Sequence, residues 1–238
     1  MFFSFTGLSY LTLFISLSFL TFRFFQYWRQ KKDTTSKLFL LLIIPLFLFA
    51  FIRTITPLFF LENIQIITFS IILVAFLESL TAAVVAYLIV YLKFPKISPW
   101  VGFSIIFFLG IIVTILTANI SYSPTIEEKG VIDWGFPSSE VGIIYSILRL
   151  VIVLATFIPL IIIVFQQFLY SEDAFLKKRS LGLTLVLILG MLLGFIDFIL
   201  NNILGIKAAI YRDYTTIIIS FLLFLVIFLT QKPETSKL

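Results

Sequence analysis

Long apolar runs separated by short polar segments dominate the chain. Seven of these runs are long enough to cross a hydrocarbon core of about 30 Å, which takes roughly 20 helical residues. The predicted helices are Phe5–Tyr27, Leu38–Phe60, Ile66–Leu92, Trp100–Ile120, Val141–Tyr170, Leu181–Leu204 and Tyr214–Thr230. The pattern predicts an all-α, polytopic membrane protein in which residues 1–238 form a single seven-transmembrane-helix bundle. No positive charge precedes the first run, so we expect a retained helix and not a signal peptide.

Composition supports a membrane protein. The chain is 61% hydrophobic and 12% charged, whereas soluble domains carry about 25% charged residues. It has neither cysteine nor histidine, so metal and haem sites built on those ligands are not expected, and we predict no metal and no cofactor. We find no catalytic motif and expect no enzyme activity. The net charge of +5 lies between the apolar runs, which suits topology signals beside anionic lipid better than nucleic-acid binding.

Lysine and arginine are distributed unequally between the two sets of loops. One set holds twelve of them: Arg23, Arg29, Lys31, Lys32, Lys37, Lys93, Lys96, Lys177, Lys178, Arg179, Lys232 and Lys237. The opposite set holds only Lys129, Lys207 and Arg212. Because cytoplasmic loops are enriched in these residues, we predict an external N-terminus, a cytoplasmic C-terminus and a multi-pass protein of the plasma membrane.

Four ionisable residues lie within the predicted helices: Arg53, Glu78, Arg149 and Asp197. Each costs several kcal/mol at the centre of a bilayer unless it is paired or hydrated. At about 1.5 Å of rise per residue, all four fall in the outer half of the membrane or near its centre. The helical faces that carry them are rich in small residues, which predicts that the charges face the interior of the bundle.

The sixth predicted helix carries a stripe of small and polar residues. Gly190, Gly194, Asp197 and Asn201 follow one another at spacings of four, three and four. The glycines form a small-xxx-small motif, which predicts close packing against another helix of this chain, with dimerisation as the alternative. Asp197 and Asn201 extend the same face toward the charged cluster.

Two interpretations of the charged residues stay open. In the first, they form structural ion pairs, Arg53 with Glu78 and Arg149 with Asp197, which fix the register of the helices. In the second, they line a polar cavity, open to the outside, that binds an anionic or zwitterionic ligand.

The longest connection is the outer loop Ser121–Glu140. Loops of this length are often functional or mobile; the alternative is a connector whose Trp134 rests at the membrane interface. The last predicted helix has no lysine and Lys207 precedes it, so a retinal Schiff base is not expected.

Three segments follow one another in an order known from a class of membrane receptors. They are the first inner loop RQKKDTTSK, the end of the fourth helix LTANISY, and the run SEDAFLKKRSLGLTLVLILGMLLGFIDFIL. With an external N-terminus, this layout resembles the seven-helix sensor region at the N-terminus of some bacterial and archaeal histidine kinases. Such sensors continue into an output domain, whereas this sequence ends eight residues after the last predicted helix. The resemblance therefore implies output through a separate protein, and it assigns no ligand-binding residues.

The leading hypothesis is a receptor-like sensor or accessory protein. It would bind a ligand or partner from the outer side and relay this to a separate cytoplasmic or membrane partner. A small secondary transporter or channel that uses the four charges is the first alternative, and a structural subunit of a membrane complex is the second. The expected partners are the lipid bilayer and a signalling or membrane-complex protein, with neither nucleic acid nor retinal.

Overall fold

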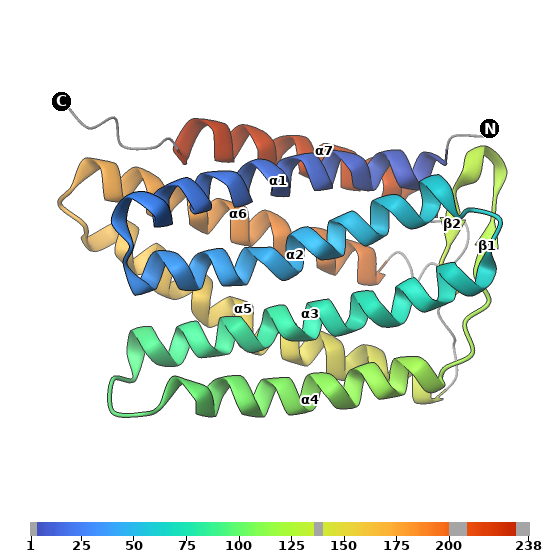
Figure 1. Ribbon diagram of the computed structural model, residues 1–238, viewed down its shortest axis with the longest axis horizontal. Helices are drawn as coiled ribbons and strands as arrows, with labels where there is room; N and C mark the ends of the chain where they lie inside the picture. The colour runs from blue at the N-terminus through green and yellow to red at the C-terminus, as the bar shows by residue number, and fades with distance from the viewer. Residues whose placement is uncertain (1–3, 136–139, 200–208, 232–238) are drawn as a thin grey trace.

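Seven α-helices lie where the apolar runs predict them (Figure 1). The computed structural model describes residues 4–135, 140–199 and 209–231. The helices are α1 (Phe5–Lys31), α2 (Thr34–Phe59), α3 (Ile64–Lys93), α4 (Pro99–Asn119), α5 (Glu140–Tyr170), α6 (Ala174–Ile199) and α7 (Ala209–Thr230). In this described part of the chain, seven helices are long and apolar enough to cross a membrane. The predicted arrangement of seven long apolar helices is thereby confirmed, and it indicates a multi-pass membrane protein.

Several helices extend beyond their predicted ends because polar residues cap them outside the apolar run. The Asp33 carboxylate accepts a hydrogen bond from the backbone N–H of Ser36 at 2.6 Å, and so starts α2 before its apolar segment. Helix α6 begins at Ala174 instead of Leu181, and therefore includes the basic triplet. Its predicted end at Leu204 lies outside the described residues.

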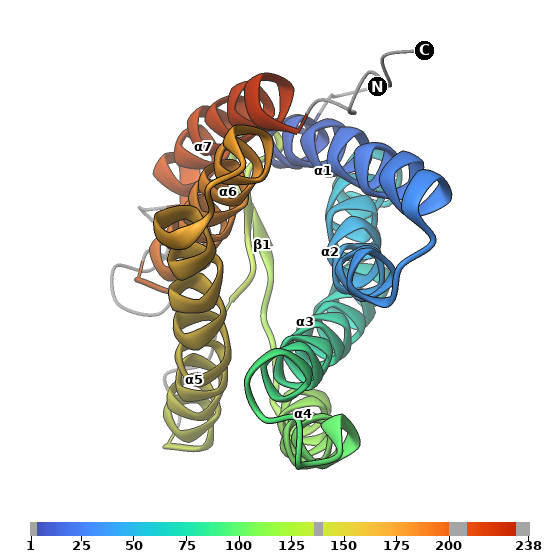
Figure 2. The ribbon, with the colours of Figure 1, turned by 90° about the vertical axis from the view of Figure 1, so that its left-hand side faces the viewer.

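The helices are arranged as an arch around the interior of the bundle (Figure 2). Helices that follow one another in sequence pack side by side, α7 packs against α1, and α3 also contacts α5. In Figure 2, α2, α3 and α4 form one arm of the arch, α7, α6 and α5 form the other, and α1 joins them at the top. Residues of α2, α3 and α5 line one small pocket between the arms.

Helices α1 and α7 meet through hydroxyl and aromatic side chains. The Ser16 hydroxyl donates a hydrogen bond to the carbonyl of Ser220 at 2.8 Å. The rings of Phe19 and Phe224 lie with centroids 5.4 Å apart. Small hydroxyl residues permit close approach of helices in a membrane, so the first and last helices of the chain become neighbours.

The two ends of the bundle differ in charge. The turns after α1, α3 and α5 lie at one end, which we call the basic end, together with the last turn of α7 (Figure 1). Its exposed cations are Arg29, Lys31, Lys32, Lys37, Lys93, Lys96, Lys177 and Lys178. The start of α1 and a small β-hairpin lie at the other end, which we call the hairpin end (Figure 1). Positive charge is thus segregated to one end, as the sequence predicts.

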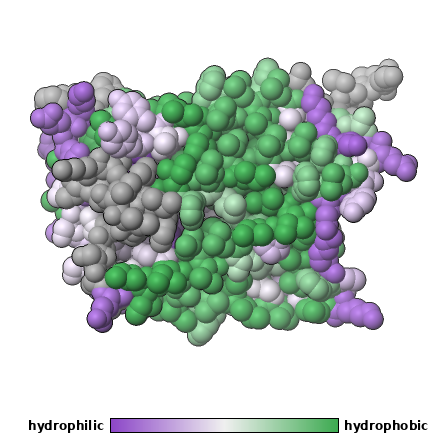
Figure 3. Space-filling view, turned by 180° about the vertical axis from the view of Figure 1, so that it is seen from behind, coloured by the Kyte–Doolittle hydropathy of each residue, from purple (hydrophilic) through white to green (hydrophobic). Residues whose placement is uncertain are grey.

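On the face seen in Figure 3, a broad apolar belt lies between these two ends. Large hydrophobic side chains are exposed on this belt, among them Phe22, Phe69, Phe108, Ile147 and Phe221. Apolar surface in contact with water is unfavourable, and a bilayer core removes it from water. The belt therefore supports a membrane position for all seven helices.

The predicted packing of Gly190 and Gly194 against another helix of this chain is wrong within the described residues, while the alternative, dimerisation, stays a prediction. Both glycines are exposed, and a Cβ atom built on either would meet nothing within 4 Å. The buried face of α6 lies in its first half, at Ser180, Thr184 and Leu187, and no residue of the range 188–197 is buried. The motif therefore lies where α6 has lost close contact with its neighbours.

Replacing Gly190 with alanine is expected to leave the fold unchanged and to stabilise it by up to about 1 kcal/mol, because alanine favours a helix over glycine. Thermal unfolding of the purified protein in detergent measures the change. Gly110→Ala is the matched control, since its Cβ would lie 2.5 Å from Cβ of Ser79 on α3, and a lower Tm is expected. Equal losses in the two variants would contradict the open surroundings of Gly190.

Candidate functional site

Arg53 lies inside the bundle although it is a cation. It belongs to α2 and is only 2% exposed. Its guanidinium carbon lies 3.9 Å from the ring centroid of Trp134 and 5.9 Å from that of Tyr10. Among the described residues, neither Nε nor Nη1 of Arg53 has a hydrogen-bond partner. Stacking on aromatic rings stabilises a cation by about 0.5–2 kcal/mol, but it leaves these buried N–H groups without an acceptor.

Pro57 affects the backbone at this position. It lies one turn after Arg53 within α2. Proline has no N–H group, so the carbonyl of Arg53 receives no hydrogen bond from that residue of its own helix. The two buried side-chain donors of Arg53 thus lie beside a position where α2 lacks one of its regular backbone hydrogen bonds.

Glu78 on α3 and Arg149 on α5 form an ion pair across the bundle. Nη2 of Arg149 donates to Oε1 of Glu78 at 2.6 Å, and the two side chains are 20% and 21% exposed. The other carboxylate oxygen, Oε2, is buried and has no partner among the described residues. The expected pair of Arg53 with Glu78 is therefore wrong, because Arg149 occupies that carboxylate while Arg53 stacks on Trp134.

A double-mutant cycle measures the strength of this pair. We expect Glu78→Gln and Arg149→Gln each to lower stability, and the double variant to lose less than the sum, with a coupling of roughly 1–3 kcal/mol. Thermal unfolding in detergent gives the four stabilities. Additive losses would contradict the ion pair.

Asp197, on α6, contributes a negative charge to the interior of the bundle. Its carboxylate interacts electrostatically with Arg149, Arg212 and Tyr10. The expected pairing with Arg149 thus has an electrostatic counterpart, although the direct hydrogen bond of Arg149 goes to Glu78. Asn201, the fifth predicted site residue, lies outside the described residues.

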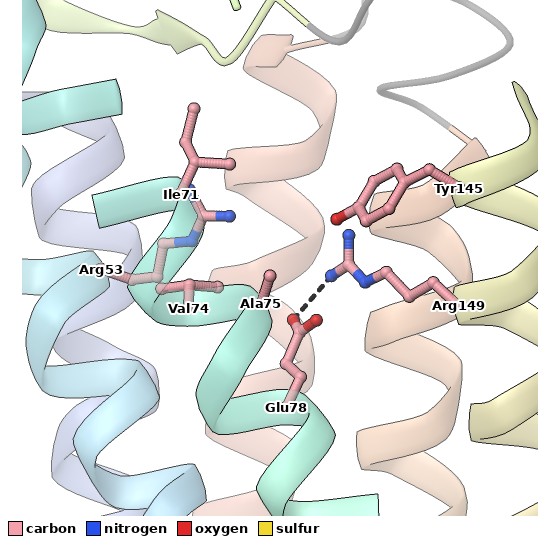
Figure 4. Close-up of a pocket in the computed structure, with 7 residues that line it drawn as sticks. All are labelled: Arg53, Ile71, Val74, Ala75, Glu78, Tyr145 and Arg149. Carbon is pink, nitrogen blue, oxygen red and sulfur yellow. Dashed lines mark hydrogen bonds and ion pairs between the residues drawn. The ribbon is translucent and has the colours of Figure 1, made fainter. Parts of the chain in front are cut away.

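A pocket lies between Arg53 and the ion pair (Figure 4). Its lining residues are Arg53, Ile71, Val74, Ala75, Glu78, Tyr145 and Arg149, and they pack so closely that no cavity large enough for a water molecule remains between them. In Figure 4, the guanidinium groups of Arg53 and Arg149 come from opposite sides toward the space above Val74 and Ala75. Pockets for drug-sized ligands hold about 300–1,000 Å³, so a ligand could enter the Arg53 pocket only after its lining side chains moved apart.

Tyr122 follows α4 in the chain and lies beside Tyr145, which lines the pocket. Burial raises the pKa of its phenol, and the neighbouring Tyr145 adds to this effect while the Arg149 cation opposes it. Tyr122 is therefore uncharged at neutral pH. The described charges of the pocket itself are Arg53, Arg149 and Glu78.

The outer loop folds into a hairpin that docks on the helices. Strands β1 (Thr125–Ile126) and β2 (Ile132–Asp133) pair antiparallel around the short helix η1 (Glu128–Gly130), and we call residues 125–133 the hairpin. The turn uses positive φ angles at Lys129 and Gly130, which glycine adopts readily. Trp134 follows directly and is 0% exposed. The interface position considered for Trp134 is wrong, because its ring is buried against Arg53.

Arg212 and Asp213 hold the hairpin to the bundle. They lie in the first turns of α7, are 1% and 0% exposed, and form an ion pair at 2.8 Å. Nη2 of Arg212 also donates to the carbonyl of Ile132 at 2.8 Å. Thr6 on α1 donates to Oδ2 of Asp213 and accepts from the backbone N–H of Ile132. We call Thr6, Ile132, Arg212 and Asp213 the hairpin anchor, which joins the starts of α1 and α7 to the hairpin.

Sequence reasoning placed Arg212 and Asp213 in an external loop and missed the hairpin anchor. The available signal was their adjacency, since opposite charges next to each other can neutralise one another within a helix. The turn residues of EEKGVIDWG, with apolar residues on both sides, were the corresponding signal for the hairpin.

The described residues show no metal site, and comparison with known proteins identifies no family. The described residues contain no group of three or more carboxylates that could hold a metal ion. No protein-family model matches the sequence, and a search among curated proteins finds no significant match. The resemblance to the sensor region of histidine kinases stays a prediction from the layout of the chain.

Proposed function

We propose that this chain is a receptor-like membrane sensor that binds a small ligand in the Arg53 pocket and relays binding to a separate partner protein. One observation carries the proposal: the Arg53 guanidinium lines the pocket and also stacks on Trp134, which follows the hairpin. A ligand that engages Arg53 alters this contact. A ligand shifts a conformational equilibrium only through its different affinities for the two states, and the shared side chain supplies that difference.

The proposed orientation places the hairpin end outside the cell and the basic end in the cytoplasm of a plasma-membrane protein. The segregation of exposed lysines supports it. Because the chain has no cysteine, single cysteines at the exposed positions Glu128 and Lys96 provide a clean test. In intact cells, a membrane-impermeant maleimide is expected to label Glu128→Cys and to spare Lys96→Cys. The reverse labelling would overturn the orientation.

Purification of the tagged protein from its native membrane in mild detergent tests the sensor proposal. We expect mass spectrometry to identify a stoichiometric signalling partner, and partner recovery to change in Arg53→Gln. A fixed set of other membrane subunits, unaffected by the substitution, would favour a structural subunit instead. A well-folded protein recovered alone would overturn both.

A small transporter or channel is the second candidate. The partial exposure of the Glu78–Arg149 pair favours it, because a translocation site must be reachable from outside the packed interior. Proteoliposomes containing the purified protein would then show substrate flux that vanishes in Glu78→Gln. Absence of flux for small anions and cations would exclude this candidate for those solutes.

A further inference from the structure

Arg23 is a membrane-helix cation that no carboxylate of the described chain neutralises. It belongs to α1 and is partly exposed, and its guanidinium carbon lies 4.7 Å from the ring centroid of Phe19. Its Nε is buried and has no hydrogen-bond partner among the described residues, and within that part of the chain Arg23 forms no salt bridge. A cation in a membrane-spanning helix is costly unless it is paired or hydrated. Its counter-ion is therefore expected to come from another molecule.

Arg23 lies close to the polar boundary at the basic end, where the ends of α1 and α7 and the start of α6 lie together (Figure 1). Tyr27 follows one turn after Arg23, and the guanidinium carbon of Arg179 on α6 lies 3.6 Å from its ring centroid. Gln231, directly after α7, accepts from Nε of Arg179 and donates to its carbonyl. Tyr27 is thus level with the end of α7, and Arg23 lies about 5.4 Å deeper. Arginine side chains this close to a helix end reach the lipid headgroups.

The charges around this position favour an anion. The described cations at the end of α1, the start of α6 and the adjoining turns are Arg23, Arg29, Lys31, Lys32, Lys177, Lys178 and Arg179. The described carboxylates there are Asp33, Glu172 and Asp173. Asp33 and Asp173 accept backbone N–H groups at the starts of α2 and α6, and Asp197 lies at the opposite end of α6. Basic clusters between helices at a membrane surface bind anionic lipid headgroups.

The surface beside Arg23 is apolar and aromatic. The ring of Phe19 lies with its centroid 5.4 Å from that of Phe224 and 6.4 Å from that of Phe228, both on α7. Phe228 is 46% exposed. We call Phe19, Arg23, Phe224 and Phe228 the α1–α7 seam. A phospholipid matches both parts of the seam, because its phosphate is an anion and its acyl chain removes apolar surface from water; inorganic phosphate matches only the cation.

We infer that the α1–α7 seam binds one anionic phospholipid, with its phosphate on Arg23 and an acyl chain along Phe19 and Phe228. The planar fork of a guanidinium group matches two phosphate oxygens. A zwitterionic headgroup binds less well, since its ammonium group would meet the surrounding cations, among them Lys178 and Arg179. The seam lies apart from the Arg53 pocket, so this inference stands independently of the sensor proposal.

Native mass spectrometry tests the inference on the purified full-length protein in detergent, with phosphatidylglycerol and phosphatidylcholine at equal concentrations. We expect the monomer to retain one phosphatidylglycerol in preference to phosphatidylcholine. Inorganic phosphate at the same concentration is expected to leave this retention unchanged. Equal retention of the two lipids, displacement by inorganic phosphate, or a second copy of the chain in place of the lipid would overturn the inference.

Arg23→Gln identifies the site. We expect this variant to fold, because no carboxylate of the described chain depends on Arg23, and to retain phosphatidylglycerol about 10- to 100-fold more weakly, since hydrogen bonds to a charged group are lost. Arg29→Gln is the matched control, because it removes an exposed cation from the same helix at the same end, and unchanged retention is expected. Equal losses in the two variants would show a response to overall surface charge and would overturn the inference.

Arg23→Lys keeps the charge and removes the planar fork. If Arg23→Gln fails to fold, this variant replaces it, with weaker retention of phosphatidylglycerol expected than in the unsubstituted protein. Unchanged retention in the variant that folds would overturn the assignment of the phosphate to Arg23.

Discussion

Replacing Asp213 with asparagine is expected to destabilise the protein by about 3–5 kcal/mol, because the substitution removes the charge of the carboxylate that is bonded directly to the buried Arg212. Arg212 is 1% exposed, and both its Nε and its Nη2 donate to Oδ1 of Asp213. The loss appears as a lower Tm in detergent and a lower yield of folded protein from the membrane.

Two variants separate this effect from a general loss of negative charge. Glu62→Gln removes an exposed carboxylate between α2 and α3, and its Tm is expected to stay within the error of the measurement. Thr6→Val removes the hydroxyl that joins Asp213 to Ile132, and about 1–3 kcal/mol is expected to be lost. Equal stabilities of Asp213→Asn and Glu62→Gln would show that the Arg212–Asp213 pair contributes nothing.

Trp134→Ala is expected to release the hairpin from the bundle at a cost of about 3–5 kcal/mol, because the deletion of a buried indole leaves a large cavity. The backbone N–H of Ile132 is held by Thr6 in the docked state. Hydrogen exchange of residues 125–133 is therefore expected to accelerate more than exchange of the helical amides.

Two control variants show which property of the Trp134 ring holds the hairpin on the bundle. Trp134→Phe keeps an aromatic face for Arg53 and removes only the Nε1 donor, which has no partner among the described residues, so a smaller loss is expected. Trp100→Ala removes an indole that is 62% exposed, and no change in hairpin exchange is expected. Unchanged exchange in Trp134→Ala would contradict the docking role of the indole.

The helices could be predicted because few backbone conformations satisfy all their hydrogen bonds within a bilayer. In lipid, each N–H and C=O group needs a partner within its own segment, so a long apolar run specifies a helix with little ambiguity. The ends of the helices depend on other residues. Asp33 starts α2 through its side-chain oxygen, and the neutralised Arg212–Asp213 pair lies within α7 although hydropathy assigns both residues to a loop.

The partners of the intramembrane charges could be predicted only in part. Depth estimates place Arg53 and Arg149 at similar levels, and both are then equally suitable for Glu78. The choice depends on how α2, α3 and α5 rotate about their axes, which the packing of many residues determines together. The docking of Trp134 on Arg53 joins α2 to a loop that comes after α4, and no local sequence pattern encodes a contact of this range.

The contact of the last helix with the first has a consequence for synthesis of the protein in the membrane. Thr6 and Asp213 are separated by 207 positions, which a ribosome traverses in roughly 10 to 40 s at 5–20 residues per second. During that interval Thr6 and Ser16 have left the ribosome, but their partners on α7 do not yet exist. The polar face of α1 therefore lacks its hydrogen-bond partners until α7 has been made, and the hairpin receives its final anchor only then.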